Sequence, residues 1–329
     1  MPPLLEIKDL MTVFDTARGR IKAVDGVSLS INSGETLGVV GESGCGKTML
    51  SLSIMRLVPA NGRIVNGEIL FSGNDLLKLS EDEMRARRGS EISMIFQEPM
   101  TSLNPVFRVG EQIAEAIRLH QKLPAKKSME LSVELLREVG IPDPQKRARD
   151  YPHNLSGGMR QRVMIAMAMS CHPQLLLADE PTTALDVTIQ AQILELISEL
   201  KRKNNMTVVL ITHDLGVIAQ AAEKVAVMYA GKIVESSTVD ALFAKPMHPY
   251  TQGLLESIPA RCFDSPEKQE YLKTIPGSVP DLYDVSPGCR FYDRCSYADE
   301  ECNRKDPELL EIDPGHFVSC WKYSLKNTN

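Results

Sequence analysis

Hydrophobic and polar residues alternate with a period of two near the N-terminus of the chain. Val27, Leu29 and Ile31 are separated by serines, which is typical of a strand that is buried on one face. Three later runs are apolar almost throughout, as expected for strands that are covered on both faces of a sheet. These runs are TLGVV (36–40), LLLAD (175–179) and TVVLIT (207–212). We therefore predict strands in the first 35 residues and three buried strands after them.

Helical patterns lie between the buried strands. Residues 48–58 are mostly apolar and follow the first buried strand, and a second helix begins after Leu185. Its apolar face consists of Ile189, Ile193, Leu196, Ile197 and Leu200. Residues 74–165 are more polar and mostly helical, with prolines that separate short elements. This alternation of strands and helices predicts a mainly parallel α/β core with a helical insertion.

The pattern changes near residue 240. Just before it, VAVMYAGKIVES predicts a hairpin that turns at Ala230–Gly231, and beyond it periodicity fades while Pro and Cys become frequent. We therefore expect a main domain at 1–240 and a small appended domain at 241–329, called the C-terminal extension below.

Composition narrows the possible classes of protein. The net charge of −6 argues against a nucleic-acid binder that relies on bulk positive charge. No apolar run approaches the roughly 18 residues that cross a bilayer. The start MPPLLEIKDLM mixes charged with apolar residues, unlike a signal peptide, and the seven cysteines are an odd number. We therefore expect a chain that works in a reducing cytosol and reaches a membrane only through partner proteins.

A glycine-rich segment after the first buried strand matches the pattern G-x-x-x-x-G-K-[ST]. Its residues are Gly41, Glu42, Ser43, Gly44, Cys45, Gly46, Lys47 and Thr48. Glycines let the backbone wrap around a phosphate with its N–H groups turned inward, and the following helix N-terminus adds partial positive charge. Lys47 suits the β- and γ-phosphates, and the Thr48 hydroxyl suits Mg²⁺. A chance glycine-rich turn is the alternative, but the flanking strand and helix favour nucleotide binding.

Two acidic residues and a histidine follow the other buried strands. Asp179 ends LLLAD, where its carboxylate can bind the hydration shell of Mg²⁺, and Glu180 can polarise an attacking water. Helix capping is the alternative role for this pair. His213 follows TVVLIT, so we expect it at the same edge of the sheet as Lys47 and Asp179.

A second element suited to phosphate lies in the helical part of the chain. Ser156, Gly157 and Gly158 stand directly ahead of a predicted helix. One compact fold cannot bring this helix N-terminus and Lys47 to the same nucleotide.

Together these motifs resemble the nucleotide-binding subunits of ABC transporters, in the family's order over residues 4–240. The resemblance implies an ATPase on a P-loop NTPase fold, with a RecA-like core, an antiparallel β subdomain and a helical subdomain at about 88–165. It further implies that Phe14 stacks on adenine and that Gln97 senses the γ-phosphate and shares Mg²⁺ with Thr48 and Asp179.

The same resemblance explains the second phosphate element. In this family two subunits pair head to tail, and the signature motif of each, here Ser156, Gly157 and Gly158, covers the ATP of its partner. Asp186 would be the D-loop residue and His213 the switch histidine. Closure of such a dimer by ATP would drive two membrane-spanning subunits.

Two longer stretches resemble one subfamily. EPMTSLNPVFRVGEQIAEAI (98–117) and LFAKPMHPYTQGLLESIP (242–259) are similar to the ATPases of dipeptide, oligopeptide and nickel importers, most of all to their D-type subunits. The resemblance implies a heterodimer with a sister ATPase, two permease subunits and an extracytoplasmic binding protein, at the cytoplasmic face of the inner membrane, with no nucleic-acid partner. Import of nickel or antimicrobial peptides is an alternative, and a soluble non-transport ABC ATPase is the alternative of a different class.

Four cysteines lie in the C-terminal extension with the spacing C-x5-C-x6-C-x17-C. They are Cys289, Cys295, Cys302 and Cys320. The gaps are wider than in familiar zinc and iron–sulfur motifs, so the residues alone leave open a four-thiolate metal site, free thiols and, least suited to a cytosol, a disulfide.

The importer resemblance implies that these four cysteines hold a [4Fe–4S] cluster, with zinc as the alternative. We expect such a cluster to brace a segment that is too poor in apolar residues to pack alone. Three arginines between the cysteines would offset thiolate charge, and two aromatic residues would shield the site. They are Arg290, Arg294 and Arg304, and Phe291 and Trp321.

Overall fold

The computed structural model describes residues 2–98, 102–183, 185–258, 274–283, 285 and 287–324. Parts of the two importer-like stretches, residues 99–101 and 259, lie outside these ranges. The chain forms two compact units, one made of residues 1–31, 36–77 and 212–329, the other of residues 32–35 and 78–211. The first unit thus contains both the glycine-rich segment and the C-terminal extension, and the domain boundary expected at residue 240 stays a prediction.

An antiparallel sheet forms one part of the first unit, with its strands in the order β2-β1-β4-β5. The strands are β1 (Leu5–Thr16), β2 (Gly19–Ile31), β4 (Gly62–Phe71) and β5 (Asn74–Asp75). Val27 and Ile31 of β2 are buried while Ser28 and Ser30 are exposed, which confirms the period-two prediction.

A second set of strands carries the glycine-rich segment. The parallel pair β3 and β9 is followed by antiparallel β10, β12 and β11. Their bounds are Thr36–Val40 (β3), Lys224–Tyr229 (β9), Lys232–Thr238 (β10), Leu310–Asp313 (β11) and His316–Val318 (β12). The predicted hairpin turns at Ala230 (φ 44°) and Gly231 (φ 86°), and positive φ at both central residues is typical of a type I′ turn. Because β12 pairs with β10, the C-terminal extension continues the sheet.

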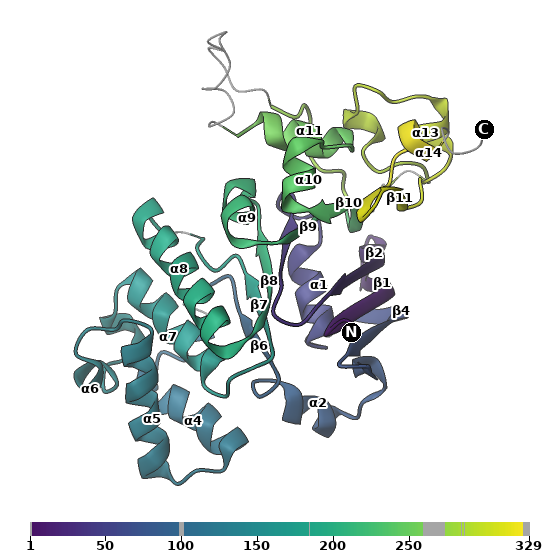
Figure 1. Cartoon of the computed structure of the whole chain (residues 1–329). Helices are drawn as coiled ribbons and strands as arrows, with labels where there is room; N and C mark the ends of the chain where they lie inside the picture. The colour runs from purple at the N-terminus through teal and green to yellow at the C-terminus, as the bar shows by residue number, and fades with distance from the viewer. Residues whose placement is uncertain are drawn as a thin grey trace, which may run out of the picture. The chain divides into compact units, whose positions relative to one another are not determined.

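Short helices complete the first unit, and Figure 1 shows α10, α11 and α13 on the side of β10 and β11. The helices are α1 (Lys47–Ile54), α9 (Leu215–Ala221), α10 (Val239–Ala244), α11 (Pro249–Glu256), α13 (Glu300–Arg304), α14 (Trp321–Ser324) and the 3₁₀ helix η3 (Tyr292–Arg294). Helix α1 ends before the predicted residue 58, because Arg56 adopts φ 51° and Leu57 N donates to Leu52 O at 2.8 Å. This is a Schellman-type end, which apolar periodicity does not reveal.

The second unit has three parallel strands, in the order β8-β7-β6, and a group of helices. The strands are β6 (Ile92–Ile95), β7 (Leu175–Asp179) and β8 (Thr207–Thr212). The two predicted strands are confirmed, whereas β6 lies inside a stretch that we expected to be mostly helical. A four-residue apolar run is too short for periodicity to separate a strand from a helix.

Helices α4, α5 and α7 lie side by side in this unit (Figure 1). The helices are α2 (Glu81–Arg87), α4 (Val109–Gln121), α5 (Ala125–Glu138), α6 (Pro144–Arg147), α7 (Gly157–Met169) and α8 (Val187–Asn204), with 3₁₀ helices η1 (Leu76–Lys78) and η2 (Pro152–Asn154). Four of the five residues predicted for the apolar face of α8, all but Ile189, are buried. None of the helices in the described parts of the chain combines the length and the apolar character that a bilayer crossing needs.

Candidate nucleotide site and cysteine pocket

The glycine-rich segment, residues 41–48, forms the loop between β3 and α1 and is called the P-loop below. A Cβ at Gly41 would lie 2.1 Å from the Met228 carbonyl oxygen, so the loop packs directly on β9. Gly46 has φ 100°, and its Cβ would lie 2.2 Å from the Ala23 carbonyl oxygen. Only glycine fits such close backbone approaches, so packing as well as phosphate chemistry requires it at these two positions.

Lys47 begins helix α1 and turns back over the loop. Its Nζ donates to the carbonyl oxygens of Gly41 at 2.7 Å and Glu42 at 2.9 Å. Only 5% of the residue is exposed. The lysine therefore holds its positive charge against the loop backbone, while Thr48 lies in the first turn of the same helix.

Cys45 has a packing role in this loop. Its side chain is fully buried, and burial raises the pKa of its thiol. Its carbonyl oxygen accepts from Gly231 N at 2.8 Å, so the hairpin turn between β9 and β10 supports the loop.

Glu180 and Gln97 lie together in the second unit. The Gln97 amide donates to Glu180 Oε2 at 3.1 Å, and the Thr183 hydroxyl donates to the same oxygen at 2.7 Å. Glu180 follows buried Asp179, has φ 45° and donates its N–H to Ile211 O at 2.9 Å. A left-handed glutamate is strained by about 1–2 kcal/mol, and such strain persists where the surrounding structure holds a side chain for function.

Ser156 caps helix α7, because its Oγ accepts from Met159 N at 3.3 Å. Gly157 and Gly158 form the first turn, and a Cβ at Gly158 would come within 3.0 Å of Ile189 on α8. Asp186 caps α8 by accepting from Ile189 N at 2.9 Å. The predicted signature and D-loop residues are therefore joined through Ile189.

The two remaining candidates are Phe14 and His213. Phe14 lies on β1 opposite Gly62 of β4, with 9% of the residue exposed, so its ring rests mainly on the sheet. His213 is exposed and precedes Asp214, whose Oδ1 caps α9 by accepting from Gly216 N at 2.7 Å. The roles of Phe14 and His213 stay predictions.

The four cysteines of the C-terminal extension line one cavity of about 260 Å³, together with Phe291 and Trp321 as expected. Desolvation is the main cause that raises the pKa of Cys289 to about 12 and that of Cys320 to about 11, with a smaller contribution from the neighbouring thiols. None of these four cysteines forms a disulfide within the described residues, and in the same ranges no group of three or more His, Cys, Asp or Glu side chains converges closely enough to hold a metal ion. The donor set thus suits a thiolate-bound group, although its ligand geometry is not preformed.

The contacts of the three arginines near these cysteines contradict one expectation. We expected them to offset thiolate charge, but each guanidinium pairs with a carboxylate instead: Arg290 with Asp25, Arg294 with Glu42 and Arg304 with Glu300. Two of these carboxylates lie on β2 and in the P-loop, far away in the sequence.

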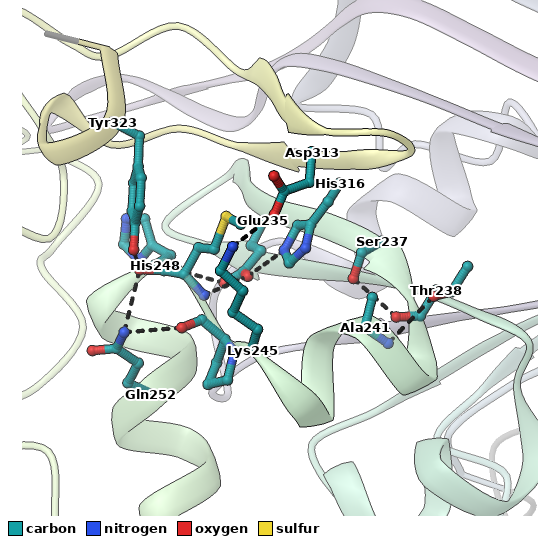
Figure 2. A network of polar contacts seen from close by, with 12 residues as sticks. Glu235, Ser237, Thr238, Ala241, Lys245, His248, Gln252, Asp313, His316 and Tyr323 are labelled. Atoms are coloured by element: carbon teal, nitrogen blue, oxygen red, sulfur yellow. Dashed lines mark hydrogen bonds and ion pairs between the residues drawn. The ribbon is translucent and has the colours of Figure 1, made fainter. Parts of the chain in front are cut away.

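Sequence reasoning missed a buried polar network around Glu235 of β10. Its carboxylate, fully buried, accepts from Met247 N (2.8 Å), His248 N (2.9 Å) and His316 Nε2 (2.7 Å). Figure 2 shows the His316 ring turned toward this carboxylate. A lone glutamate directly after the apolar pair Ile233–Val234 of a predicted strand was the available signal, because buried charges require partners.

The network holds the segment His248-Pro249-Tyr250 at the start of α11. His248 Nδ1 accepts from Tyr250 N at 3.1 Å, Pro249 occupies the first helical turn, and burial lowers the pKa of His248 to about 3. The Tyr250 hydroxyl accepts from Glu42 N at 2.9 Å. The importer-like segment therefore reaches the P-loop directly.

Comparisons with known proteins agree with these motifs. Residues 24–183 match the family "ABC transporter", and residues 234–302 match "Oligopeptide/dipeptide transporter, C-terminal region". The chain is 52% identical to the oligopeptide transport ATP-binding protein OppD of Bacillus subtilis, over 97% of this chain and 88% of that protein. It is 50% identical to the dipeptide transport ATP-binding protein DppD of the same organism, over 98% of this chain and 95% of that protein.

A solved structure shows the same fold. The dimeric ATP-binding cassette MJ0796, in a post-hydrolysis state with ADP and Pi, is 26% identical and superposes with a TM-score of 0.65 over 71% of this chain and 98% of that one. The expected P-loop NTPase fold is confirmed. The chain therefore belongs to the ABC transporter ATPases, in the group that carries the oligopeptide/dipeptide transporter C-terminal region.

Proposed function

We propose that the chain is the ATP-hydrolysing motor subunit of an importer for dipeptides and oligopeptides. The observation that carries this proposal is the nearly full-length similarity to oligopeptide and dipeptide transport ATP-binding proteins, which includes the C-terminal region. The contact between Gln97 and Glu180 supports it, because the residue proposed to sense the γ-phosphate and the residue proposed to polarise the attacking water lie within hydrogen-bond distance.

In this proposal the P-loop binds the phosphates of ATP with its N–H groups and Lys47. Phe14 stacks on the adenine. Thr48, Gln97 and Asp179 hold Mg²⁺, which offsets phosphate charge when bound. Their hydroxyl, amide and carboxylate oxygens are the hard ligands that Mg²⁺ prefers.

Glu180 and His213 act at the γ-phosphate. The Glu180 carboxylate orients and polarises the attacking water, helped by the hydrogen bonds that fix Oε2. His213 contacts the γ-phosphate as the switch histidine, and its exposure after β8 leaves its ring accessible.

The partners follow from the head-to-tail pairing of this family. Ser156, Gly157, Gly158 and Asp186 would cover the nucleotide of a sister ATPase. The pair would dock on two permease subunits at the cytoplasmic face of the inner membrane, supplied by an extracytoplasmic binding protein. Reconstitution of these subunits tests the proposal: peptide uptake should require ATP and the binding protein, and uptake without ATP would contradict it.

For the C-terminal extension we propose a [4Fe–4S] cluster held by Cys289, Cys295, Cys302 and Cys320, with zinc as the alternative. Four thiols on one cavity are the support for it, and such a group would link the segments of a poorly packed region. Anaerobically purified protein should contain iron and sulfide at about four each per chain. Finding zinc, or no metal, would contradict the cluster.

A further inference from the structure

Glu42 is the one acidic residue in the P-loop. Its carboxylate belongs to a loop that, in the proposed function, surrounds the negatively charged phosphates of ATP. A mobile, uncompensated carboxylate there would repel the phosphates, and its own backbone would be free to move. The loop therefore needs a counter-charge that also fixes its position.

Arg294 of the C-terminal extension supplies that counter-charge. Its Nη1 donates to Glu42 Oε2 at 2.7 Å and its Nη2 donates to Oε1 at 3.0 Å. The pair is bidentate, the geometry that makes arginine–carboxylate contacts directional as well as strong. The arginine side chain is only 5% exposed and that of Glu42 is 31% exposed, so solvent screens the pair weakly.

The arginine is itself held by further contacts. Its Nε donates to the Pro276 carbonyl oxygen at 2.8 Å, and Nη1 lies 3.3 Å from the Tyr229 hydroxyl. The guanidinium carbon lies 5.7 Å from the centre of the Tyr229 ring and 5.9 Å from that of Phe291. Because these contacts fix the guanidinium, its bidentate hydrogen bonds in turn fix the position of the Glu42 carboxylate.

Tyr250 holds the backbone of the same residue. Its hydroxyl accepts from Glu42 N at 2.9 Å, and its ring is fully buried 4.6 Å from the centre of the Tyr229 ring. Tyr250 cannot shift easily, because the preceding segment is bound to Glu235 through Met247 N and His248 N. Both the side chain and the N–H of Glu42 are thus held by groups from beyond residue 240.

We propose that Arg294 and Tyr250 are positioning residues of the nucleotide site, which hold Glu42 so that the P-loop is preformed to receive phosphate. This inference rests on the proposal that residues 41–48 bind the phosphates of ATP. Arg294 and Tyr250 act through Glu42, so their loss affects nucleotide affinity more than the chemical step. The C-terminal extension is then a part of the ATP site.

Titration of the full-length chain with a fluorescent N-methylanthraniloyl derivative of ATP, with Mg²⁺ present, tests this inference. Arg294→Met should weaken binding about tenfold, or about 1.4 kcal/mol. Arg294→Lys keeps the charge but loses the bidentate contact, and Tyr250→Phe loses the hydroxyl, so each should weaken binding about threefold. In ATPase assays these variants should raise KM and leave kcat within about twofold.

A second substitution separates compensation of the Glu42 charge from a general effect of Arg294 on stability. Adding Glu42→Gln to Arg294→Met removes the uncompensated charge, so affinity should return to within about threefold of the wild type. A merely structural role of Arg294 would give no such recovery. Arg304→Met is the matched control, because Arg304 makes an exposed ion pair with Glu300 in the same segment, and it should bind nucleotide like the wild type.

Lys47→Ala distinguishes failure of this inference from failure of the proposed site. If Lys47→Ala abolishes binding while Arg294→Met and Arg294→Lys bind like the wild type, the positioning role is wrong and the site stands. If Lys47→Ala binds normally, the proposed site itself is wrong. If Arg294→Met does not fold, Arg294→Lys and Tyr250→Phe decide, and wild-type affinity in both overturns the inference.

Discussion

Replacing Glu235 by glutamine should loosen the attachment of the C-terminal extension to β10. The buried carboxylate accepts three hydrogen bonds, and its two oxygens face Met247 N and His248 N separately. Glutamine has the same shape, but its terminal NH₂ group donates. In either orientation of the amide, its NH₂ group faces the N–H of Met247 or of His248, so that two donors meet without an acceptor between them.

The size of the effect follows from these contacts. The substitution removes a hydrogen bond to a charged acceptor, about 1.5–3 kcal/mol, and leaves buried donors without a partner, about 1–3 kcal/mol. The two contributions overlap, so we expect a loss of about 3 kcal/mol in the free energy of local opening. Since about 1.4 kcal/mol corresponds to tenfold, amide exchange should accelerate by about two orders of magnitude.

Hydrogen exchange followed by mass spectrometry measures this opening in a peptide that contains Met247, His248 and Tyr250. Lys245→Met is the matched control, because its ion pair with Asp313 lies beside this network (Figure 2) and both of its side chains are exposed. The control should leave the exchange rate unchanged. Equal exchange in Glu235→Gln and wild-type protein, or equal acceleration in both variants, would refute the reasoning.

Three further predictions concern catalysis, pH and the thiols. Glu180→Gln should keep ATP binding and lower phosphate release by about 10²–10⁴-fold, and unchanged hydrolysis would contradict its role as base. Burial lowers the pKa of His248 to about 3, whereas an unfolded histidine has a pKa of about 6.5. As the pH falls, the unfolded chain therefore takes up this proton at a higher pH than the folded chain does. The free energy of unfolding should be constant above about pH 6.5 and decrease below it, by up to about 1.4 kcal/mol per pH unit. In His248→Asn this slope in thermal melts should flatten, and an unchanged slope would point to another group. Cys320→Ser should lose most of the iron found in anaerobic wild-type protein, and equal iron content would exclude Cys320 as a ligand.

Much of the α/β core could be predicted from local patterns. The runs at 36–40, 175–179 and 207–212 are strands with buried residues throughout, because a strand covered on both faces shows a nearly continuous apolar run and no alternation with polar residues. The hairpin that turns at Ala230–Gly231 and most of the apolar face of α8 were equally predictable. Strand β6 and the end of α1 were not, since a short run and a left-handed Arg56 carry no periodic signal.

The nucleotide site was predictable only in part. Motif spacing predicted the P-loop, Glu180 and Gln97 from short local patterns, and the structure brings Gln97 and Glu180 into contact, while their roles at ATP stay predictions. The contact between Arg294 and Glu42 spans 252 positions, and that between His316 and Glu235 spans 81. Such pairs depend on the tertiary fold, so a charged residue in a cysteine-rich segment gave no sign of its partner. For that reason the sequence alone favours a role for Arg294 beside the thiols.

The most direct test of the transport role is peptide uptake into vesicles that contain this chain, a sister ATPase, two permease subunits and the peptide binding protein. We predict ATP-dependent uptake of dipeptides or oligopeptides that Lys47→Ala abolishes. Uptake that continues at the wild-type rate in Lys47→Ala would contradict the assignment of this chain as the motor.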